Sequence, residues 1–209
     1  MEKYAKRFTK QEKSWILYDW ANSVYATNIM AAIFPIYFGA VCESAGVDNV
    51  QVWGYGTSAA TLVVAVMGPV LGAVGDHKGM KKKLFTGFLA AGVLFTLMMA
   101  VFDQWQLLLA GYVISCLFYD SFLTDVTTEE RMDRVSSWGY AMGYIGGSTI
   151  PFVISIAVLL IMGMDNPAAV KFSVVITSVW WLIFSIPILK NVNQTHYIEA
   201  PASKLLSHT

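Results

Sequence analysis

The sequence predicts an all-α membrane protein with six transmembrane helices, and three observations lead to this class. Of the 209 residues, 56% are hydrophobic and 13% are charged, whereas an average soluble domain has about 25% charged residues. The apolar residues form long blocks with short joins between them. No block alternates polar and apolar residues as a strand of a membrane β-barrel does, and helices satisfy their own backbone hydrogen bonds inside lipid.

Each block is near the length of about 20 residues that crosses the hydrocarbon of a bilayer. In chain order the six blocks are 15–38, 54–74, 84–102, 105–122, 135–162 and 170–189. The first block contains Asp19 and is too long for a signal peptide, so we expect it to remain in the mature chain. Before the fifth block, Thr127 and Glu130 have the spacing of a capping box, which predicts a short helical turn. The predicted organisation is a basic N-terminus (1–13), a helical bundle (14–190) and a flexible tail (191–209).

The positive charges predict how the bundle lies in the membrane. Thirteen of the fourteen Lys and Arg residues flank the same ends of the six blocks, and only Lys171 falls on the other side. Because Lys and Arg are retained in cytoplasmic segments, both termini are predicted to be cytoplasmic. This topology accounts for the basic residues, so no nucleic-acid partner is expected.

The residue types argue against an enzyme and against a bound metal or cofactor. His77, His196 and His208 all lie outside the six blocks, which leaves no histidine within the membrane for a serine dyad, a haem or a copper site. An aspartyl pair of Asp19 and Asp120 is disfavoured because both residues are near predicted cytoplasmic ends. The two cysteines, Cys42 and Cys116, match no spacing motif, so no disulfide framework is expected.

The first block carries a polar face. Asp19, Asn22 and Ser23 are at positions i, i+3 and i+4 of a helix and share one side of it. A carboxylate that faced lipid at mid-depth would cost about 2.5 to 3.5 kcal/mol, so this face is predicted to line a solute or proton path inside the bundle. Tyr25 could line the same path or pack as a core aromatic residue. The alternative for Asp19 is that it faces cytoplasmic water and complements the positive N-terminal end of the helix.

Two glycine stripes predict close helix packing. Gly68, Gly72 and Asp76 recur every four residues at the end of the second block, and Gly139, Gly143 and Gly147 do so in the fifth. Residues four apart lie on one helix face, and small residues there let two helix backbones approach closely. Both stripes are predicted to be packing surfaces rather than ligand sites.

The join between the second and third blocks resembles the signature loop of the major facilitator superfamily. Gly72, Asp76, Gly79 and Lys81 carry the resemblance, while Met80 stands where the family usually has a basic residue. Three further stretches, "YDWANSVYA" at 18–26, "FLTDVTTEERMDRVSSWGYAMGYIGG" at 122–147 and "HYIE" at 196–199, resemble the autophagy-related vacuolar effluxers and their bacterial relatives. Asp120 and Thr124 depart from that pattern.

The resemblance implies half of a fold that has about twelve membrane helices in this superfamily. It implies a transporter of a small polar solute, with amino acids as one class, in the inner (plasma) membrane of a bacterium. Helices two and five would form the seam between two halves, so the glycine stripes imply a homodimer or a separate C-terminal half. We therefore expect a half-sized transporter that works as a dimer by alternating access. The alternative is a truncated or non-transporting membrane subunit that needs a separate second half.

Overall fold

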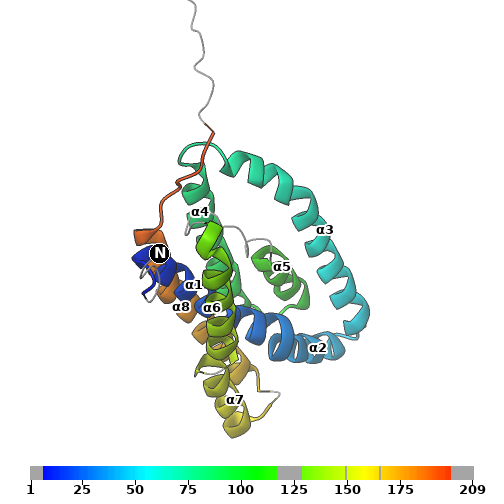
Figure 1. Cartoon of the computed structure of the whole chain (residues 1–209). Helices are drawn as coiled ribbons and strands as arrows, with labels where there is room; N and C mark the ends of the chain where they lie inside the picture. The colour runs from blue at the N-terminus through cyan, green and yellow to red at the C-terminus, as the bar shows by residue number, and fades with distance from the viewer. Residues whose placement is uncertain (1–6, 117–128, 149, 165, 199–209) are drawn as a thin grey trace, which may run out of the picture.

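A computed structural model describes residues 7–116, 129–148, 150–164 and 166–198 as a helical bundle (Figure 1). The elements in chain order are α1 (Lys10–Tyr25), the π-helical segment η1 (Ala26–Ala32), α2 (Phe34–Ser44), α3 (Asn49–Gly75), α4 (Met80–Met99), α5 (Trp105–Cys116), α6 (Glu129–Ser148), α7 (Ile150–Met162) and α8 (Pro167–Asn191). Within these residues the single bridge of β type joins His77 to Ile198.

Five of the six predicted spans correspond to helices that are long enough to cross a membrane. In the described part of the chain, Lys10–Ser44, Asn49–Gly75, Met80–Met99, Arg131–Met162 and Pro167–Asn191 are long and apolar enough to cross a membrane. The fourth predicted span corresponds to α5, which is apolar but shorter, and residues 117–122 of that block lie outside the described residues. Thr127, Asp120 and Thr124 lie outside them as well. The all-helical class is confirmed for the described residues, with five candidate membrane spans; the count of six spans stays a prediction.

The first helix begins before its apolar block. Thr9 caps α1: its hydroxyl accepts from the Glu12 N–H at 3.1 Å, and the Glu12 carboxylate accepts from the Thr9 N–H at 2.8 Å. This reciprocal capping box satisfies two backbone donors at the start of the helix. The helix therefore starts at Lys10, because the capping side chains rather than hydrophobicity set its first turn.

Helix α1 lies at the centre of the bundle, between α6 and α8 (Figure 1). A Cβ atom at Gly139 would collide with the Trp15 ring, and a Cβ atom at Gly143 would lie 2.6 Å from the Ser23 hydroxyl. Two glycines of the α6 stripe are therefore covered by α1 of the same chain. The sequence had predicted this stripe as part of a seam for an outside partner. Gly139 and Gly143 pack internally because α1 brings its larger side chains to the gap that they leave.

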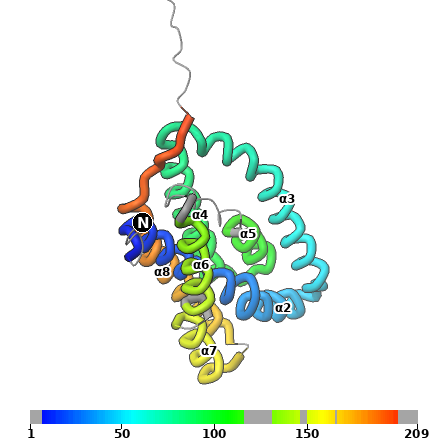
Figure 2. Tube along the Cα trace, viewed as in Figure 1, coloured from blue at the N-terminus to red at the C-terminus, as the bar shows by residue number. Residues whose placement is uncertain are grey.

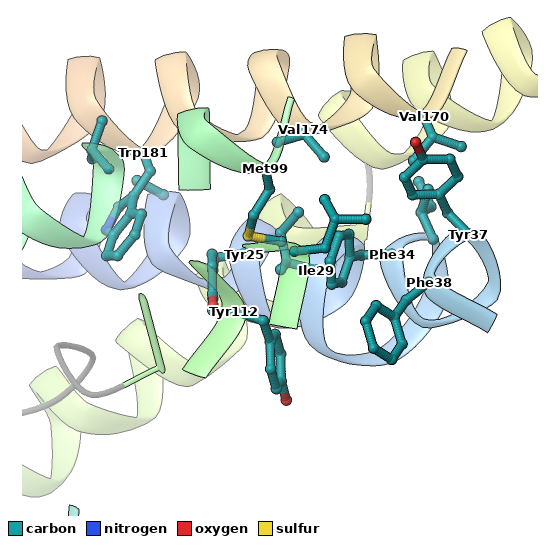
Figure 3. Close-up of a cluster of buried hydrophobic side chains, with 14 of the residues drawn as sticks. Tyr25, Ile29, Phe34, Tyr37, Phe38, Met99, Tyr112, Val170, Val174 and Trp181 are labelled. Atoms are coloured by element: carbon teal, nitrogen blue, oxygen red, sulfur yellow. The ribbon is translucent and has the colours of Figure 1, made fainter. Parts of the chain in front are cut away.

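The buried core joins α1, η1, α2, α4, α5, α7 and α8 (Figure 3). Tyr25 and Trp181 are both fully buried, with ring centroids 5.3 Å apart, and Phe34 stacks on Tyr112 at 6.1 Å. Gly92 of α4 leaves the space for the Trp181 ring, since a Cβ atom there would lie 2.7 Å from it. Aromatic rings thus fix how these helices pack.

Helix α3 lies on the outside of this core. Figures 1 and 2 show it as a long curved helix that passes around α5. Gly56 contacts Leu109 of α5, but every residue from 61 to 70 is exposed. A Cβ atom at Gly68 or at Gly72 would have no neighbour within 4 Å. The glycine stripe of α3 is therefore uncovered within the described part of this chain.

Candidate functional site: the polar interior of the first membrane helix

The first membrane helix changes its hydrogen-bond register in the middle of the bundle. Over Ala26–Ala32 it is π-helical, and the Ile33 N–H donates to the Asn28 carbonyl five residues earlier at 3.1 Å. Pro35 comes three residues after this segment, in the first turn of α2. It has no N–H to donate to the Ala31 carbonyl, and its ring would clash with that carbonyl in a regular α-helix. The wider turn accommodates the proline. Such π-helical turns occur frequently at functional sites.

Asn28, inside this turn, is the most buried polar side chain of the helix. Its exposed fraction is 0%. Its amide nitrogen donates to the Thr177 hydroxyl of α8 at 2.8 Å and to the Ser155 hydroxyl of α7 at 3.4 Å. Its amide oxygen is buried and accepts no hydrogen bond within the described residues. Three elements therefore converge on one amide that keeps an unused acceptor.

Sequence reasoning did not single out Asn28. The available signal was an asparagine within an apolar stretch, seven residues before a proline. Its partners could not be found from the sequence, because they come from helices more than 120 residues away in the chain.

Helix α8 supplies a row of buried hydroxyl groups to the same interior. Each donates to the carbonyl four residues earlier in its own helix: Ser173 to Ala169 at 3.0 Å, Thr177 to Ser173 at 2.7 Å, Ser178 to Val174 at 2.9 Å and Ser185 to Trp181 at 2.6 Å. Because a hydroxyl has one proton and two lone pairs, these oxygens remain able to accept. The interior of the bundle is thus polar but uncharged along this face.

Tyr25 lies next to this cluster as a packed aromatic residue. Its hydroxyl is 2.5 Å from the Ser115 hydroxyl of α5, and Ser115 donates its own proton to the Tyr112 carbonyl at 2.9 Å. Tyr25 is therefore the donor of this bond. The contact ties the first helix to α5 while its ring packs on Trp181 (Figure 3).

The predicted polar face of α1 is divided by the packing. Asp19 and Ser23 face the glycines of α6, where the Asp19 carboxylate lies 3.0 Å from the position of a Cβ atom on Gly139. Ser23 donates to the Asp19 carbonyl at 2.9 Å. Asn22 is buried, with an exposed fraction of 2%, and its amide oxygen accepts no hydrogen bond within the described residues. Both buried asparagines of this helix thus have an unused acceptor.

The predicted signature loop is a tight turn between α3 and α4. Gly72 accepts from the Asp76 N–H at 3.0 Å as α3 ends, and Gly79, with φ of 75°, precedes α4 in the left-handed region that suits glycine. Lys81 lies half-buried in the first turn of α4. Gly147 is in the last turn of α6, where the surroundings of the side chains are not described.

Residues 192–198, predicted as part of a flexible tail, lie against this loop. Gln194 hydrogen bonds to both Gly75 and Gly79, and the Ile198 N–H donates to the Asp76 carbonyl at 2.7 Å. The sequence pattern did not show this because the partners are backbone groups of the loop, which any residue can provide.

Ion pairs lie at both ends of the bundle. At the end that holds the signature loop, Arg131 donates two bonds of 2.8 Å to the buried Glu12 carboxylate. At the opposite end, Lys171 contacts Asp103 at 2.6 Å, and this hydrogen bond lowers the pKa of the Asp103 carboxyl below its usual value. Among the described residues, no group of three His, Cys, Asp or Glu side chains could hold a metal ion.

Comparison with known proteins supports the family that the motifs indicated. The family model described as "Vacuole effluxer Atg22 like" matches residues 123–206. The chain is 44% identical over 211 residues to the "Uncharacterized MFS-type transporter YxiO" of Bacillus subtilis (strain 168), with 93% of this chain and 49% of the relative covered. The chain therefore spans about half the length of this curated relative. No solved structure matches.

The signature loop, the spans and these matches agree, and the predicted resemblance is confirmed: the chain is similar to the vacuole-effluxer-like family and to a relative named as a transporter of the major facilitator type.

Proposed function

We propose that this chain forms a six-helix unit of a membrane transporter that moves a small polar solute by alternating access as a dimer. The observation that carries the proposal is the buried Asn28 amide in the π-helical turn, with polar partners from α7 and α8. The similarity to the curated relative supports it, since that relative is named as a transporter.

The chemistry of the interior favours a solute that offers N–H or O–H donors. A buried acceptor without a hydrogen bond costs about 1 to 3 kcal/mol. Within the part of the chain that the structure describes, the first membrane helix has two such acceptors, on Asn22 and Asn28. A solute with an ammonium or amide group would satisfy such oxygens during its passage. Amino acids are therefore the first solutes to test. In this proposal Asp19, which lies on the same membrane helix and faces α6, binds the ammonium group or a proton.

We also propose that both termini are cytoplasmic and that the protein lies in the plasma membrane of a bacterium. Three contacts place the basic flanks at the same end of the bundle: Arg131 with Glu12, Asn191 with Ser14, and Lys82 with Asn193. Lys171 lies at the other end, where Asp103 neutralises it. This distribution supports a positive cytoplasmic side.

Replacement of Asn28 tests the proposed function. The purified protein is reconstituted in lipid vesicles, and uptake of a mixture of labelled amino acids is measured for the wild type and for Asn28→Leu. We expect at least a tenfold lower uptake in Asn28→Leu, because leucine keeps the branched shape of the side chain and removes the amide. The matched control is Thr96→Val, since Thr96 is buried on α4, outside the polar cluster around Asn28, and its hydroxyl donates to the Gly92 carbonyl of its own helix. Normal uptake by Asn28→Leu at equal protein amount would overturn the role of this amide.

The second candidate is a membrane subunit that transports only with a separate second half. The uncovered apolar face of α3 favours it, because Leu62, Val66 and Val70 are all exposed alongside Gly68. Absence of solute uptake by the wild-type chain alone, with uptake restored by a co-expressed partner, would establish this candidate.

A further inference from the structure

The segment that follows α8 returns along the loop between α3 and α4. Residues 193–198 are here called the strap. Figure 1 shows the strap running from the end of α8 to the loop that leads into α4. Before the strap, Val192 is buried with an exposed fraction of 2%, and Asn191 donates to the Ser14 hydroxyl of α1 at 2.8 Å. The strap therefore starts from a fixed point on α1 and α8.

The side chain of Gln194 joins the end of one helix to the start of the next. Its amide nitrogen donates to the Gly75 carbonyl, in the last residue of α3, at 2.9 Å. Its amide oxygen accepts from the N–H of Gly79, which precedes α4, at 2.9 Å. Helix ends leave carbonyl and N–H groups without partners inside the helix. One carboxamide satisfies one group of each kind, which a side chain with only donors or only acceptors cannot do.

Further contacts extend the attachment along the strap. The Ile198 N–H donates to the Asp76 carbonyl at 2.7 Å, and Ile198 pairs with His77 in a parallel bridge. Lys82 donates to the Asn193 side chain at 2.9 Å. The Lys78 ammonium lies over the Tyr197 ring, 5.1 Å from its centroid. The strap thus contacts both the backbone of the loop and the basic side chains that follow it.

Two features indicate that these contacts can open. The bonds from Gln194 to Gly79 and from Lys82 to Asn193 are exposed to solvent, where hydrogen bonds contribute little net stability. In addition, α3 is exposed from residue 61 to residue 70 and has open space beside Gly72. The end of α3 is therefore fastened mainly through the loop, and an element with few buried contacts is one that can move.

We propose that the strap is a releasable latch that fastens the signature-loop end of α3 and α4 to α1 and α8. With the latch closed, the loop is fixed relative to the core; with the latch open, α3 and the loop move independently of the core. The kinetic consequence rests on the proposed transport function: the latch sets the rate of conformational exchange and leaves the affinity for solute unchanged. Gln194 is a positioning residue in this device.

Hydrogen exchange of the full-length protein in lipid nanodiscs tests the latch directly. In Gln194→Ala we expect amide exchange of the peptide that contains Gly79, and of the peptide that contains Ile198, to rise about 5- to 30-fold, as for the loss of one or two hydrogen bonds. Gln194→Glu keeps the acceptor for Gly79 but loses the donor to Gly75, so a smaller rise is expected. The matched control is Gln51→Ala, an exposed glutamine whose side chain, within the described residues, bonds only to Tyr55 on its own helix. It should leave both peptides unchanged.

Solute uptake by the same variants separates the latch from the transport function. We expect Gln194→Ala to change the maximal uptake rate at least twofold while the half-saturating solute concentration stays the same. Unchanged exchange at Gly79 in Gln194→Ala would overturn the latch. Raised exchange with an unchanged maximal rate would overturn its role in transport. Raised exchange together with no uptake by the wild type would leave the latch standing and contradict the proposed function instead.

Discussion

Glu12 and Asn28 are both buried on the first membrane helix, but their surroundings differ. The Glu12 carboxylate, with an exposed fraction of 1%, accepts two bonds from the Arg131 guanidinium and one from the Thr9 N–H. The Asn28 amide uses its donors and leaves its oxygen without a bond within the described residues. A fully satisfied group stabilises the fold, whereas a partly satisfied one is expected where a ligand or a motion completes it.

Loss of the arginine that pairs with Glu12 should strongly destabilise the bundle. In Arg131→Met a buried carboxylate loses its opposite charge, which costs about 3 to 5 kcal/mol. We expect a clear drop in the thermal unfolding midpoint in detergent. The double variant Glu12→Gln with Arg131→Met should recover part of the loss, because no buried charge then remains.

Lys10→Met is the matched control for that prediction. Lys10 is exposed at the same end of α1, so the substitution removes the same charge without uncovering a buried partner. An equal drop in the midpoint for Lys10→Met and Arg131→Met would contradict the assignment of a special role to the buried pair.

At the scale of the helices, glycines that look alike in the sequence have different surroundings. Gly139 of α6 is buried against Trp15 of α1, whereas Gly87 of α4 is exposed with no atom within 4 Å of an added Cβ. The first permits two helices to approach closely, and the second only adds backbone freedom. Spacing along one helix does not distinguish these cases, because the difference lies in the neighbouring helix.

Alanine substitutions should separate the two kinds of glycine. Gly139→Ala places a methyl group within 3.0 Å of Trp15 and Asp19, and such overpacking costs about 1 to 3 kcal/mol. Gly87→Ala should be neutral or stabilising, since alanine is favoured over glycine in a helix by about 1 kcal/mol. The measurement is the thermal midpoint of each variant at equal detergent concentration. A midpoint for Gly139→Ala at or above that of Gly87→Ala would show that α6 does not pack on α1 in this way.

At the scale of the whole molecule, the core and α3 are unequally packed. The core draws on α1, α8 and the aromatic residues between them, whereas the middle of α3 has an exposed apolar face with Gly68 in it. Apolar side chains on a membrane helix can face lipid, so exposure alone does not demand a protein partner. A glycine on such a face is what lets a second helix come close.

The native mass in mild detergent, with bound detergent subtracted, tests whether α3 has a partner. The proposed function predicts a dimer for the wild type and a shift toward monomer for Gly68→Leu, because leucine separates the two helix backbones. Gly87→Leu, on an exposed site of α4, should leave the dimer unchanged. A wild-type monomer would instead favour the subunit that needs a separate second half.

The sequence indicated the membrane class, the helical blocks and the family resemblance because each depends on local properties. A long apolar run must be helical in lipid wherever it packs, and the signature loop lies within one short stretch. The polar residues Asp19, Asn22 and Ser23 were also found in this way. Thr9 and Glu12 also have the spacing of a capping box. The start of the first helix was nevertheless predicted too late, because the prediction followed the hydrophobic pattern, which begins after these residues.

The partners of these residues depended on the tertiary structure. Asn28 has polar partners, Ser155 and Thr177, on distant helices, and Gly139 and Gly143, predicted for an outer seam, are covered by α1. Likewise, Gln194 looked like part of a tail because its partners are backbone groups of a loop more than 100 residues earlier. Apolar length is a property of one segment and can be read from it. A contact is a property of two segments, and the fold alone brings them together.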